Sequence, residues 1–425
     1  MNKRHMAILP LLILGVILSG CALGTPLART EPITLRYAYE GATPEIEALL
    51  VEFHDRHPNI TVELLGPGTE DSVLMQGVLN GSIDLIRGGA EALGLAQQGL
   101  FLPLDDIHLD EWADERDDYF GGLWESLSVS GEQYGIPAGL DTVVTFVNTG
   151  ALDALGEQLP APSAPWDKYA FLDLATRLNH PEGLPGDPSG SIYGFCSDHQ
   201  QLDPFVFVYA NGGSIVDDLQ DPQRPTLDDT ATIEALAWYV DLFGRYGVAP
   251  RPEFMGRNYG SAGLRIAQAG GRCGLWVGMF SERGDTGGSA WQYDWDMLPI
   301  PGSASDLGLA MVEGYFVPRG GRHPDEALLL ARFLSDSWRA SGRLLPPRRS
   351  LVSDPTYEQL IGERLAAQVA GFSSSMTIIS LDFSPLLVDV GMAALGAVDY
   401  AITQNADIVP LLQEAQQVAA QAFAR

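Results

Sequence analysis

Apolar and polar residues alternate between Ile33 and Tyr39, so that every second side chain shares one face. A period of two residues predicts a strand with one buried face. The same alternation returns at 60–65 and predicts a second strand. The two segments are far enough apart for a connecting helix, which parallel neighbouring strands require.

The residues between these two strands have the pattern of a helix at 45–57. Apolar side chains recur at helical spacing from Ile46 to Phe53, and Pro58 ends the pattern. Thr43 belongs to the residue types that cap a helix, and a proline follows it at the first helical position. A strand, a helix and a strand with short joints predict a βαβ unit with a right-handed crossover.

The alternation of strands and helices continues along the chain. Helices are predicted at 71–80, 91–98, 230–246 and 325–334, and strands at 83–87, 272–280, 297–300 and 315–317. An apolar segment at 205–209 is predicted to be buried, and roughly the last sixty residues are expected to be mostly helical. This order predicts α/β architecture, in which functional groups lie at the carboxyl ends of strands.

The N-terminus has the three parts of a signal peptide. A basic start precedes an apolar stretch at 6–18, and the sequence Leu-Ser-Gly-Cys ends at Cys21. The stretch is shorter than the roughly 20 apolar residues that cross a bilayer, and a short uncleaved anchor is the alternative. We therefore expect cleavage of residues 1–20, lipid on Cys21 and a tether at 21–30. This would hold the protein on the extracytoplasmic face of a bacterial cell membrane.

Composition narrows the class of partner. The 425 residues include 55 Asp and Glu against 25 Lys and Arg, which gives a formal net charge of −30. Nucleic acid is not expected as a partner, because its binding depends on Lys and Arg that neutralise phosphates. The chain is long enough for two hydrophobic cores. Beyond Cys21, the cysteines Cys196 and Cys273 form either a disulfide or two separately buried thiols.

Known catalytic motifs are absent from the sequence, which has no phosphate loop, no Gly-x-Ser-x-Gly, no His-Glu-x-x-His and no Cys-x-x-Cys. His54 and His57 could share a metal, but polar residues near a helix end are the simpler interpretation. The acidic segment 105–118 lacks the oxygen spacing of a calcium loop, which favours a solvated surface. We expect no cofactor and no metal, while paired carboxylates for glycoside hydrolysis stay open.

Several short motifs occur in an order that resembles one protein family. They are Phe-His-Asp-Arg-His-Pro-Asn-Ile at 53–60, Gln-Gly-Leu-Phe-Leu-Pro-Leu-Asp at 98–105, Tyr-Gly-Ile-Pro-Ala-Gly-Leu-Asp-Thr at 134–142, Phe-Val-Asn at 146–148, Trp166, Ala-Asn-Gly-Gly at 210–213, Trp238 and Pro-Pro-Arg at 346–348. Together with the lipid-attachment motif, they resemble the extracellular solute-binding proteins of ABC importers, family 1, typified by maltose- and other sugar-binding proteins. Ala164 and Pro165 depart from the family pattern before Trp166.

The resemblance implies an α/β, two-lobe periplasmic-binding-protein fold of type II, with discontinuous lobes joined by a hinge. The first lobe is expected at 31–140 plus 294–340 and the second at 141–293 plus 341–425. Closure around a ligand is the motion that such a hinge implies. The closed protein, expected to be a monomer, would then dock on the transmembrane subunits of a permease, with a separate ATPase supplying energy.

Candidate ligand-binding residues follow from the resemblance and from the chemistry of sugars. Sugar sites combine aromatic faces with a few polar groups that bind hydroxyls. Tyr39 and Glu40 end the first strand, and core packing is the alternative for Tyr39. Asp141 matches a carboxylate of the hinge-entry motif that accepts hydroxyl donors. Asp203 lies in a loop that carries ligand contacts in relatives, or else it caps a helix.

Further positions complete the expected site. Phe280 matches a stacking tryptophan of the relatives, while Trp276 is expected in the core. Glu313 and Tyr315 open a strand where relatives have a glycine-rich cleft segment. Arg348 matches a basic residue that contacts the ligand or the hinge, with a surface ion pair as the alternative.

The sequence therefore predicts an extracellular lipoprotein that binds a small solute, a sugar or oligosaccharide, and delivers it to a permease. The same fold could instead bind a polyamine, a phosphate ester, a peptide or a metal chelate. A membrane-attached glycan-active enzyme and a sensor partner of a signalling kinase are further alternatives.

Overall fold

The computed structural model of the chain describes residues 31–41, 43–66, 71–104, 113–161, 164–184, 190–219, 222–284, 290–302, 307–373, 376–380 and 385–423. The predicted signal peptide, Cys21 and the tether at 21–30 lie outside these residues, as does most of the acidic segment 105–118. Within the described ranges, no helix is long and apolar enough to cross a membrane.

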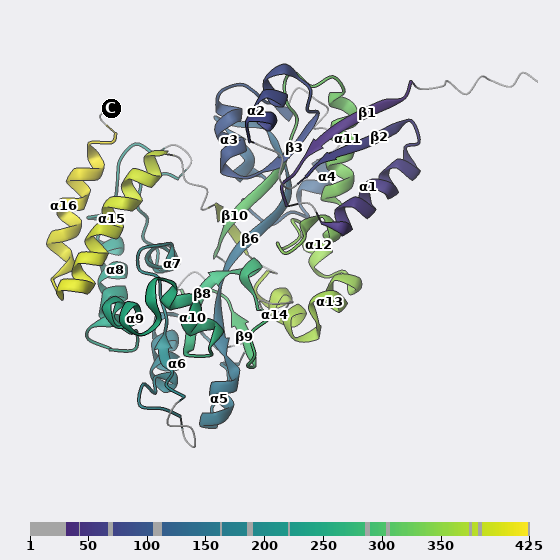
Figure 1. Cartoon of the computed structure of the whole chain (residues 1–425). Coiled ribbons are helices and arrows are strands. Elements are labelled where there is room, and N and C mark those ends of the chain that lie inside the picture. The colour runs from purple at the N-terminus through teal and green to yellow at the C-terminus, as the bar shows by residue number, and fades with distance from the viewer. Residues whose placement is uncertain are drawn as a thin grey trace, which may run out of the picture.

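The first third of the chain alternates between short strands and helices, as the sequence pattern predicts (Figure 1). Its elements are β1 (Ile33–Ala38), α1 (Pro44–Arg56), β2 (Ile60–Leu65), α2 (Asp71–Asn80), β3 (Leu85–Gly88), α3 (Ala90–Gln97), α4 (Ala113–Arg116), the 3₁₀ helix η3 (Glu125–Leu127), β4 (Ser128–Val129) and β5 (Glu132–Gln133). Thr43 occupies the N-cap position of α1 without a side-chain capping hydrogen bond.

The middle of the chain begins with its longest described strand and is otherwise mainly helical. Its elements are β6 (Gly135–Asn148), α5 (Thr149–Leu155), α6 (Lys168–Leu178), β7 (Tyr193–Phe195), α7 (Asp203–Ala210), α8 (Thr230–Phe243), α9 (Pro252–Tyr259), η4 (Gly260–Ala262), α10 (Gly263–Ala269), β8 (Cys273–Met279), η5 (Phe280–Glu282) and β9 (Trp295–Leu298).

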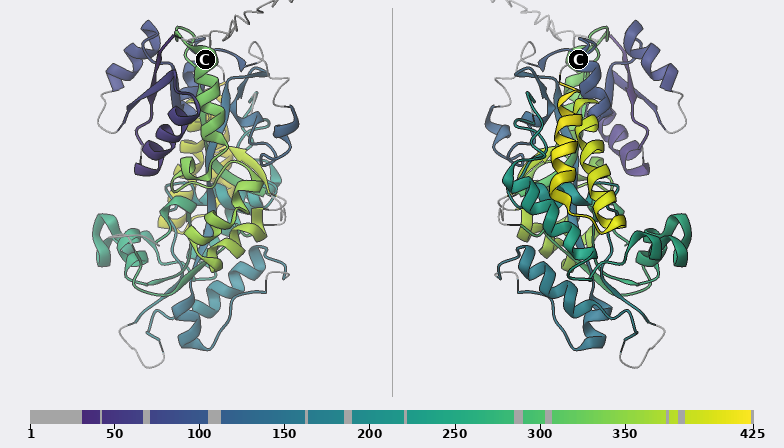
Figure 2. Two further views of the ribbon diagram at one scale, coloured as in Figure 1. Left: turned by 90° about the vertical axis from the view of Figure 1, so that its right-hand side faces the viewer. Right: turned by 90° about the vertical axis from the view of Figure 1, so that its left-hand side faces the viewer.

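The last third returns to the first part of the fold and then ends in helices. Its elements are β10 (Leu307–Phe316), α11 (Pro324–Ser335), η7 (Trp338–Ser341), α12 (Arg349–Val352), α13 (Pro355–Ile361), α14 (Glu363–Ser373), β11 (Thr377–Ser380), α15 (Pro385–Gln404) and α16 (Ile408–Ala420). The last two helices lie side by side along one flank of the molecule (Figures 1 and 2). The largely helical C-terminal region confirms the expectation from the sequence.

Nine of the described strands form one hydrogen-bonded sheet in the order β2-β1-β3-β10-β6-β8-β7, with β11 beside β10 and β9 beside β6. Strands β1, β2 and β3 are parallel, and β10 runs antiparallel to β3 and β6. The first half of β6 pairs with β10, and from Val143 onward it pairs with β8 and β9. Strand β6 therefore runs from one half of the molecule into the other (Figure 1).

Buried apolar residues form two clusters around these strands. The first contains Leu35 and Phe53 and extends through the sheet to Trp276 and Trp295. The second contains Phe171 of α6 and includes buried residues of α7, α8, α15 and α16. The first cluster crosses the expected lobe boundary, since Trp276 lies in the segment 141–293 assigned to the second lobe. The lobe boundaries stay a proposal. Strand β9 lies in the segment 294–340 assigned to the first lobe, yet it pairs with the part of β6 that was assigned to the second lobe. This pairing would move the boundary at 294 to a later residue.

Candidate ligand-binding site

Sheet register gathers several of the candidate residues onto one face. Tyr315 of β10 lies directly opposite Arg87 of β3. The parallel pairing of β1 with β3 ends at Ala38 and Ile86, so the next residues, Tyr39 and Arg87, are also neighbours. Side chains of paired residues point to the same face of a sheet. Three adjacent strands therefore place two tyrosines around one arginine.

Arg87 is the centre of this group. Its guanidinium lies over the Tyr39 ring at 4.2 Å from the centroid and 5.9 Å from that of Tyr315. The Nε atom donates a hydrogen bond of 2.7 Å to Oε2 of Glu313, and Nη1 donates to the carbonyl oxygen of Ala340 in η7. The Arg87 side chain is 0% exposed, whereas that of Glu313 is 32% exposed. A ligand can thus reach Glu313 and the partly buried Tyr39 while Arg87 stays covered.

The tyrosines of this group stay neutral at physiological pH. Burial raises the pKa of Tyr39, although the adjacent Arg87 charge works in the opposite direction. Burial also raises the pKa values of Tyr37 and Tyr315, which are fully buried. Their hydroxyl groups therefore carry no charge.

The same face continues onto β6. Asp141 of β6 lies opposite Met311 of β10. Glu313 lies two residues after Met311 in β10, so its side chain is on the same face of the sheet. Met311 is 41% exposed, which is unusual for a methionine in a central strand of a sheet. Tyr39, Glu313, Met311 and Asp141 thus form a row that crosses the sheet from β1 to β6.

Asp141 is held by the segment that follows β8. Its carboxylate accepts hydrogen bonds from the backbone N–H of Ser281 at 2.8 Å and from the Ser281 hydroxyl at 2.5 Å. Partial burial raises the pKa of Asp141, and the two donors partly offset this. Asp141 therefore links β6 to η5 two residues before β6 begins to pair with β8.

Phe280 does not present a ring face to solvent. It is 0% exposed and lies under the guanidinium of Arg283, whose carbon is 4.2 Å from the ring centroid. The expected stacking on a sugar is therefore not available in this conformation of the protein. Trp276 is 2% exposed and packs on Phe146, which confirms its expected place in the core.

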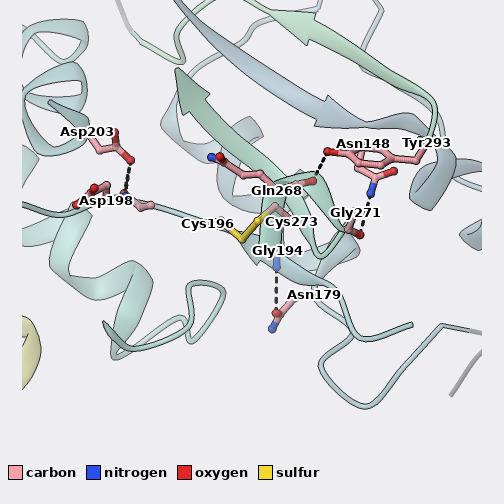
Figure 3. Close-up of a disulfide and its surroundings, with 11 residues drawn as sticks. Asn148, Asn179, Gly194, Cys196, Asp198, Asp203, Gln268, Gly271, Cys273 and Tyr293 are labelled. Atoms are coloured by element: carbon pink, nitrogen blue, oxygen red, sulfur yellow. Dashed lines mark hydrogen bonds between the residues drawn. A yellow bond between two sulfur atoms is a disulfide. The ribbon is translucent and has the colours of Figure 1, made fainter. Parts of the chain in front are cut away.

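Asp203 lies at the start of α7 and is buried. Its carboxylate accepts a hydrogen bond from the hydroxyl of Ser197 at 2.6 Å. It also accepts one from the backbone N–H of Asp198 at 2.9 Å (Figure 3). Burial raises the pKa of Asp203 to about 7, and the negative charges of Asp198 and Glu282 add to this. Glu282 also raises the pKa of Asp141, so both carboxyl groups lie within electrostatic range of η5.

A disulfide anchors the neighbouring chain. Cys196 follows β7 and is bonded to Cys273 at the start of β8, with 5.5 Å between the Cα atoms (Figure 3). This settles the choice that the sequence left open between a disulfide and two thiols. Since β7 and β8 are parallel neighbours, the bond fixes the origin of the loop that leads to Asp203.

The model of one protein family matches most of the chain. The family described as bacterial extracellular solute-binding protein matches residues 38–337. The chain belongs to this family.

Solved structures of solute-binding proteins share its fold at low sequence identity. The sugar-binding protein MalE from Xanthomonas citri has a TM-score of 0.72 and 18% identity, covering 92% of this chain and 97% of that one. The ABC substrate-binding protein Lmo0181 from Listeria monocytogenes, in complex with cycloalternan, has a TM-score of 0.70 and 16% identity, covering 93% and 100%. UgpB from Mycobacterium tuberculosis, in complex with glycerophosphocholine, has a TM-score of 0.67 and 17% identity, covering 93% and 99%. These similarities establish the two-lobe periplasmic-binding-protein fold predicted from the sequence.

Two predicted site residues of this solute-binding protein lie apart from the row on the sheet. Glu40 is exposed in the turn after β1. Arg348 is 8% exposed and forms ion pairs with Glu115 at 2.9 Å and Asp336 at 2.6 Å, beside the Tyr119 ring. Arg348 thus pairs with the exposed Asp336 and the partly buried Glu115, and neither partner belongs to the candidate site. These ion pairs join the segments around residues 115, 336 and 348.

Three residues that lie at the candidate site were not predicted from the sequence. Arg87 is the last residue of the strand predicted at 83–87. This position at the carboxyl end of a strand was the one feature of the sequence that could have marked it as a functional residue. Met311 and Ser281 had no local signal, because their place depends on pairing between distant segments. His54, considered for a metal, instead contacts the carbonyl oxygen of Ile60 at 2.7 Å. Among the described residues, no group of three or more His, Cys, Asp or Glu could hold a metal ion.

Proposed function

We propose that this chain is the solute-binding lipoprotein of an ABC importer and that it binds a sugar or oligosaccharide between its two lobes. The observation that carries the proposal is the row formed by Tyr39, Glu313 and Asp141 on one face of the sheet. A neutral tyrosine ring suits the apolar face of a sugar, and carboxylates accept hydrogen bonds from hydroxyl groups. The similar proteins from Listeria monocytogenes, in complex with cycloalternan, and from Xanthomonas citri, a sugar-binding protein, support the same class of ligand.

The arginines near the row argue against a phosphate ester as the ligand. Arg87 is covered and paired with Glu313. Arg283 donates to the carbonyl oxygens of Phe280 and Arg343, and Arg343 donates to those of Ser281 and Arg283. Phosphate recognition uses guanidinium groups whose paired donors face the ligand. These three guanidinium groups face the protein, which favours an uncharged polyhydroxyl ligand.

The proposed lipid anchor at Cys21 would localise the binding protein to a membrane. Two or more acyl chains hold a protein stably at a membrane. The residues from 22 to 30 would then act as a short lead that keeps the lobes close to a permease in the same membrane. We propose a monomer that docks on the transmembrane subunits in its ligand-bound form and has no catalytic activity of its own.

A thermal-shift panel tests the ligand class. Protein lacking residues 1–20 is heated with maltose, mannobiose, D-tagatose, cycloalternan, glycerophosphocholine or spermidine. A ligand at 100 times its Kd stabilises by about 2.7 kcal/mol. For a chain of about 400 residues, this corresponds to a rise in Tm of roughly 3 °C.

The panel separates the competing ligand classes. A shift with at least one saccharide and none with the last two compounds supports the proposal. A shift with spermidine alone would favour a cationic ligand, to which the carboxylates of Glu282 and Glu313 could bind. A shift with glycerophosphocholine alone would contradict the argument from the arginines.

A further inference from the structure

We propose that Arg87 is a positioning residue that sets the affinity of the site without touching the ligand. The inference rests on the proposed function, because it assigns Tyr39 and Glu313 as the ligand contacts. Arg87 belongs to none of the sequence motifs that resemble the family, and its role follows from contacts between segments far apart in the chain.

One guanidinium group joins three separate elements. It contacts the Tyr39 ring that follows β1, the Glu313 carboxylate of β10 and the Ala340 carbonyl of η7. Arginine suits this position because its planar fork presents several donors in fixed directions. A lysine would bring the same charge to a single nitrogen and could not hold the carboxylate and the carbonyl oxygen in the same arrangement.

Exposure separates Arg87 from the residues it orients. Its side chain is 0% exposed, so a ligand meets Glu313, which is 32% exposed, and the partly buried Tyr39. The ion pair fixes the position of the Glu313 oxygen Oε2, and this also fixes the orientation of the other carboxylate oxygen, Oε1. The cation lies over the Tyr39 ring and restricts its orientation. Binding sites lose affinity when the supporting side chains no longer hold the contacting ones in place.

The linkage to η7 extends the role of Arg87 beyond the first strands. Ala340 is three residues before Arg343, whose side chain donates to the carbonyl oxygens of Ser281 and Arg283. Ser281 in turn donates twice to Asp141. The row of candidate ligand contacts is therefore supported from both ends through the segment 340–343.

The test compares Arg87→Lys and Arg87→Met with a matched control, Arg339→Met. Arg339, which lies in η7, also forms an ion pair, with Glu52 at 2.6 Å, but it contacts neither Tyr39 nor Glu313. Calorimetry measures the Kd of whichever of maltose, mannobiose, D-tagatose and cycloalternan gives the largest shift in the panel. We expect binding about tenfold weaker for both Arg87 variants and within about twofold of wild type for Arg339→Met.

A second background distinguishes positioning from a general structural effect. In protein that carries Tyr39→Ala and Glu313→Gln, the further change Arg87→Met should alter the Kd by less than about twofold, because the residues it positions are gone. An unchanged affinity of the single Arg87 variants overturns the inference. An equal loss in both backgrounds also overturns it.

A structure of Arg87→Lys provides a readout that needs no ligand. We expect the Tyr39 ring and the Glu313 carboxylate to move from the positions they have in the wild-type protein, and unchanged positions overturn the inference. If no saccharide stabilises wild-type protein, the proposed function fails, and this structure alone decides on Arg87. If a saccharide binds wild type and Arg87→Lys equally well, only the inference about Arg87 fails.

Discussion

Replacing Asp203 by asparagine is expected to remove a large part of the pH dependence of folding. The carboxyl group is buried at the start of α7 and accepts two hydrogen bonds at the same oxygen, Oδ2. Asparagine has nearly the same shape, and its amide oxygen can accept both hydrogen bonds. The substitution therefore removes the ionisation of residue 203 while it keeps the local structure.

The size of the effect follows from the pKa. Burial raises the pKa of Asp203 from the ordinary value of 3.8 to about 7. The folded state therefore holds the proton more tightly than the unfolded state. The contribution of Asp203 to the free energy of unfolding is highest below about pH 4, falls as the pH rises to about 7, and then levels off. The whole decrease is about 4 kcal/mol, and roughly 2.5 kcal/mol of it lies between pH 5 and pH 8.

Urea unfolding at pH 5 and pH 8 measures this difference. Between these two pH values, wild-type protein should lose about 2.5 kcal/mol more stability than Asp203→Asn. Ser197→Ala provides an internal comparison, because it removes one donor to the ionised carboxylate and should raise the pKa of Asp203 further. If wild type and Asp203→Asn depend on pH equally, the assignment of a raised pKa to Asp203 is refuted.

Further predictions concern the disulfide, the hinge and the anchor. Replacing Cys196 and Cys273 by serine should lower the free energy of unfolding by up to about 4.5 kcal/mol, because the bond closes a loop of 77 residues; an unchanged urea midpoint would contradict this. Asp141→Ala should weaken saccharide binding about tenfold in calorimetry without unfolding the protein by circular dichroism, and an unchanged Kd would remove Asp141 from the site. Cys21→Ala should move the protein from the membrane to the soluble fraction in the native host, and continued membrane association would argue for an uncleaved anchor.

Local sequence patterns predicted those parts of the fold that have a clear period. Strand β2 and helix α2 occur at the predicted residues, and α1 is shifted by one residue at each end. Strand β10 begins at Leu307, well before the predicted start at 315. The sequence did not reveal its first residues, because Gly308, Glu313 and Gly314 interrupt the apolar pattern. The apolar segment at 205–209 belongs to a helix, a choice that an unbroken apolar run does not encode.

The candidate site was less predictable than the fold, because it depends on register between distant strands. Tyr39 and Glu313 were candidates from their places at strand ends and from the family resemblance. Their common partner, Arg87, is 226 residues from Glu313, and no local pattern specifies that pairing. Phe280 was expected to match a stacking tryptophan of the relatives, yet Arg283 and the surrounding core cover it here.

The position of Asp141 connects the candidate site to the expected hinge. Strand β6 pairs with β10 up to Thr142 and with β8 from Val143, so the strand changes partners just after this carboxylate. The same carboxylate holds Ser281 of η5, which follows β8. A ligand hydroxyl that binds Asp141 must share an acceptor that already fixes η5. Binding at this residue would therefore act on β6 and η5, which lie beside the expected hinge. A ligand shifts an equilibrium between open and closed states only through contacts that differ between the two states.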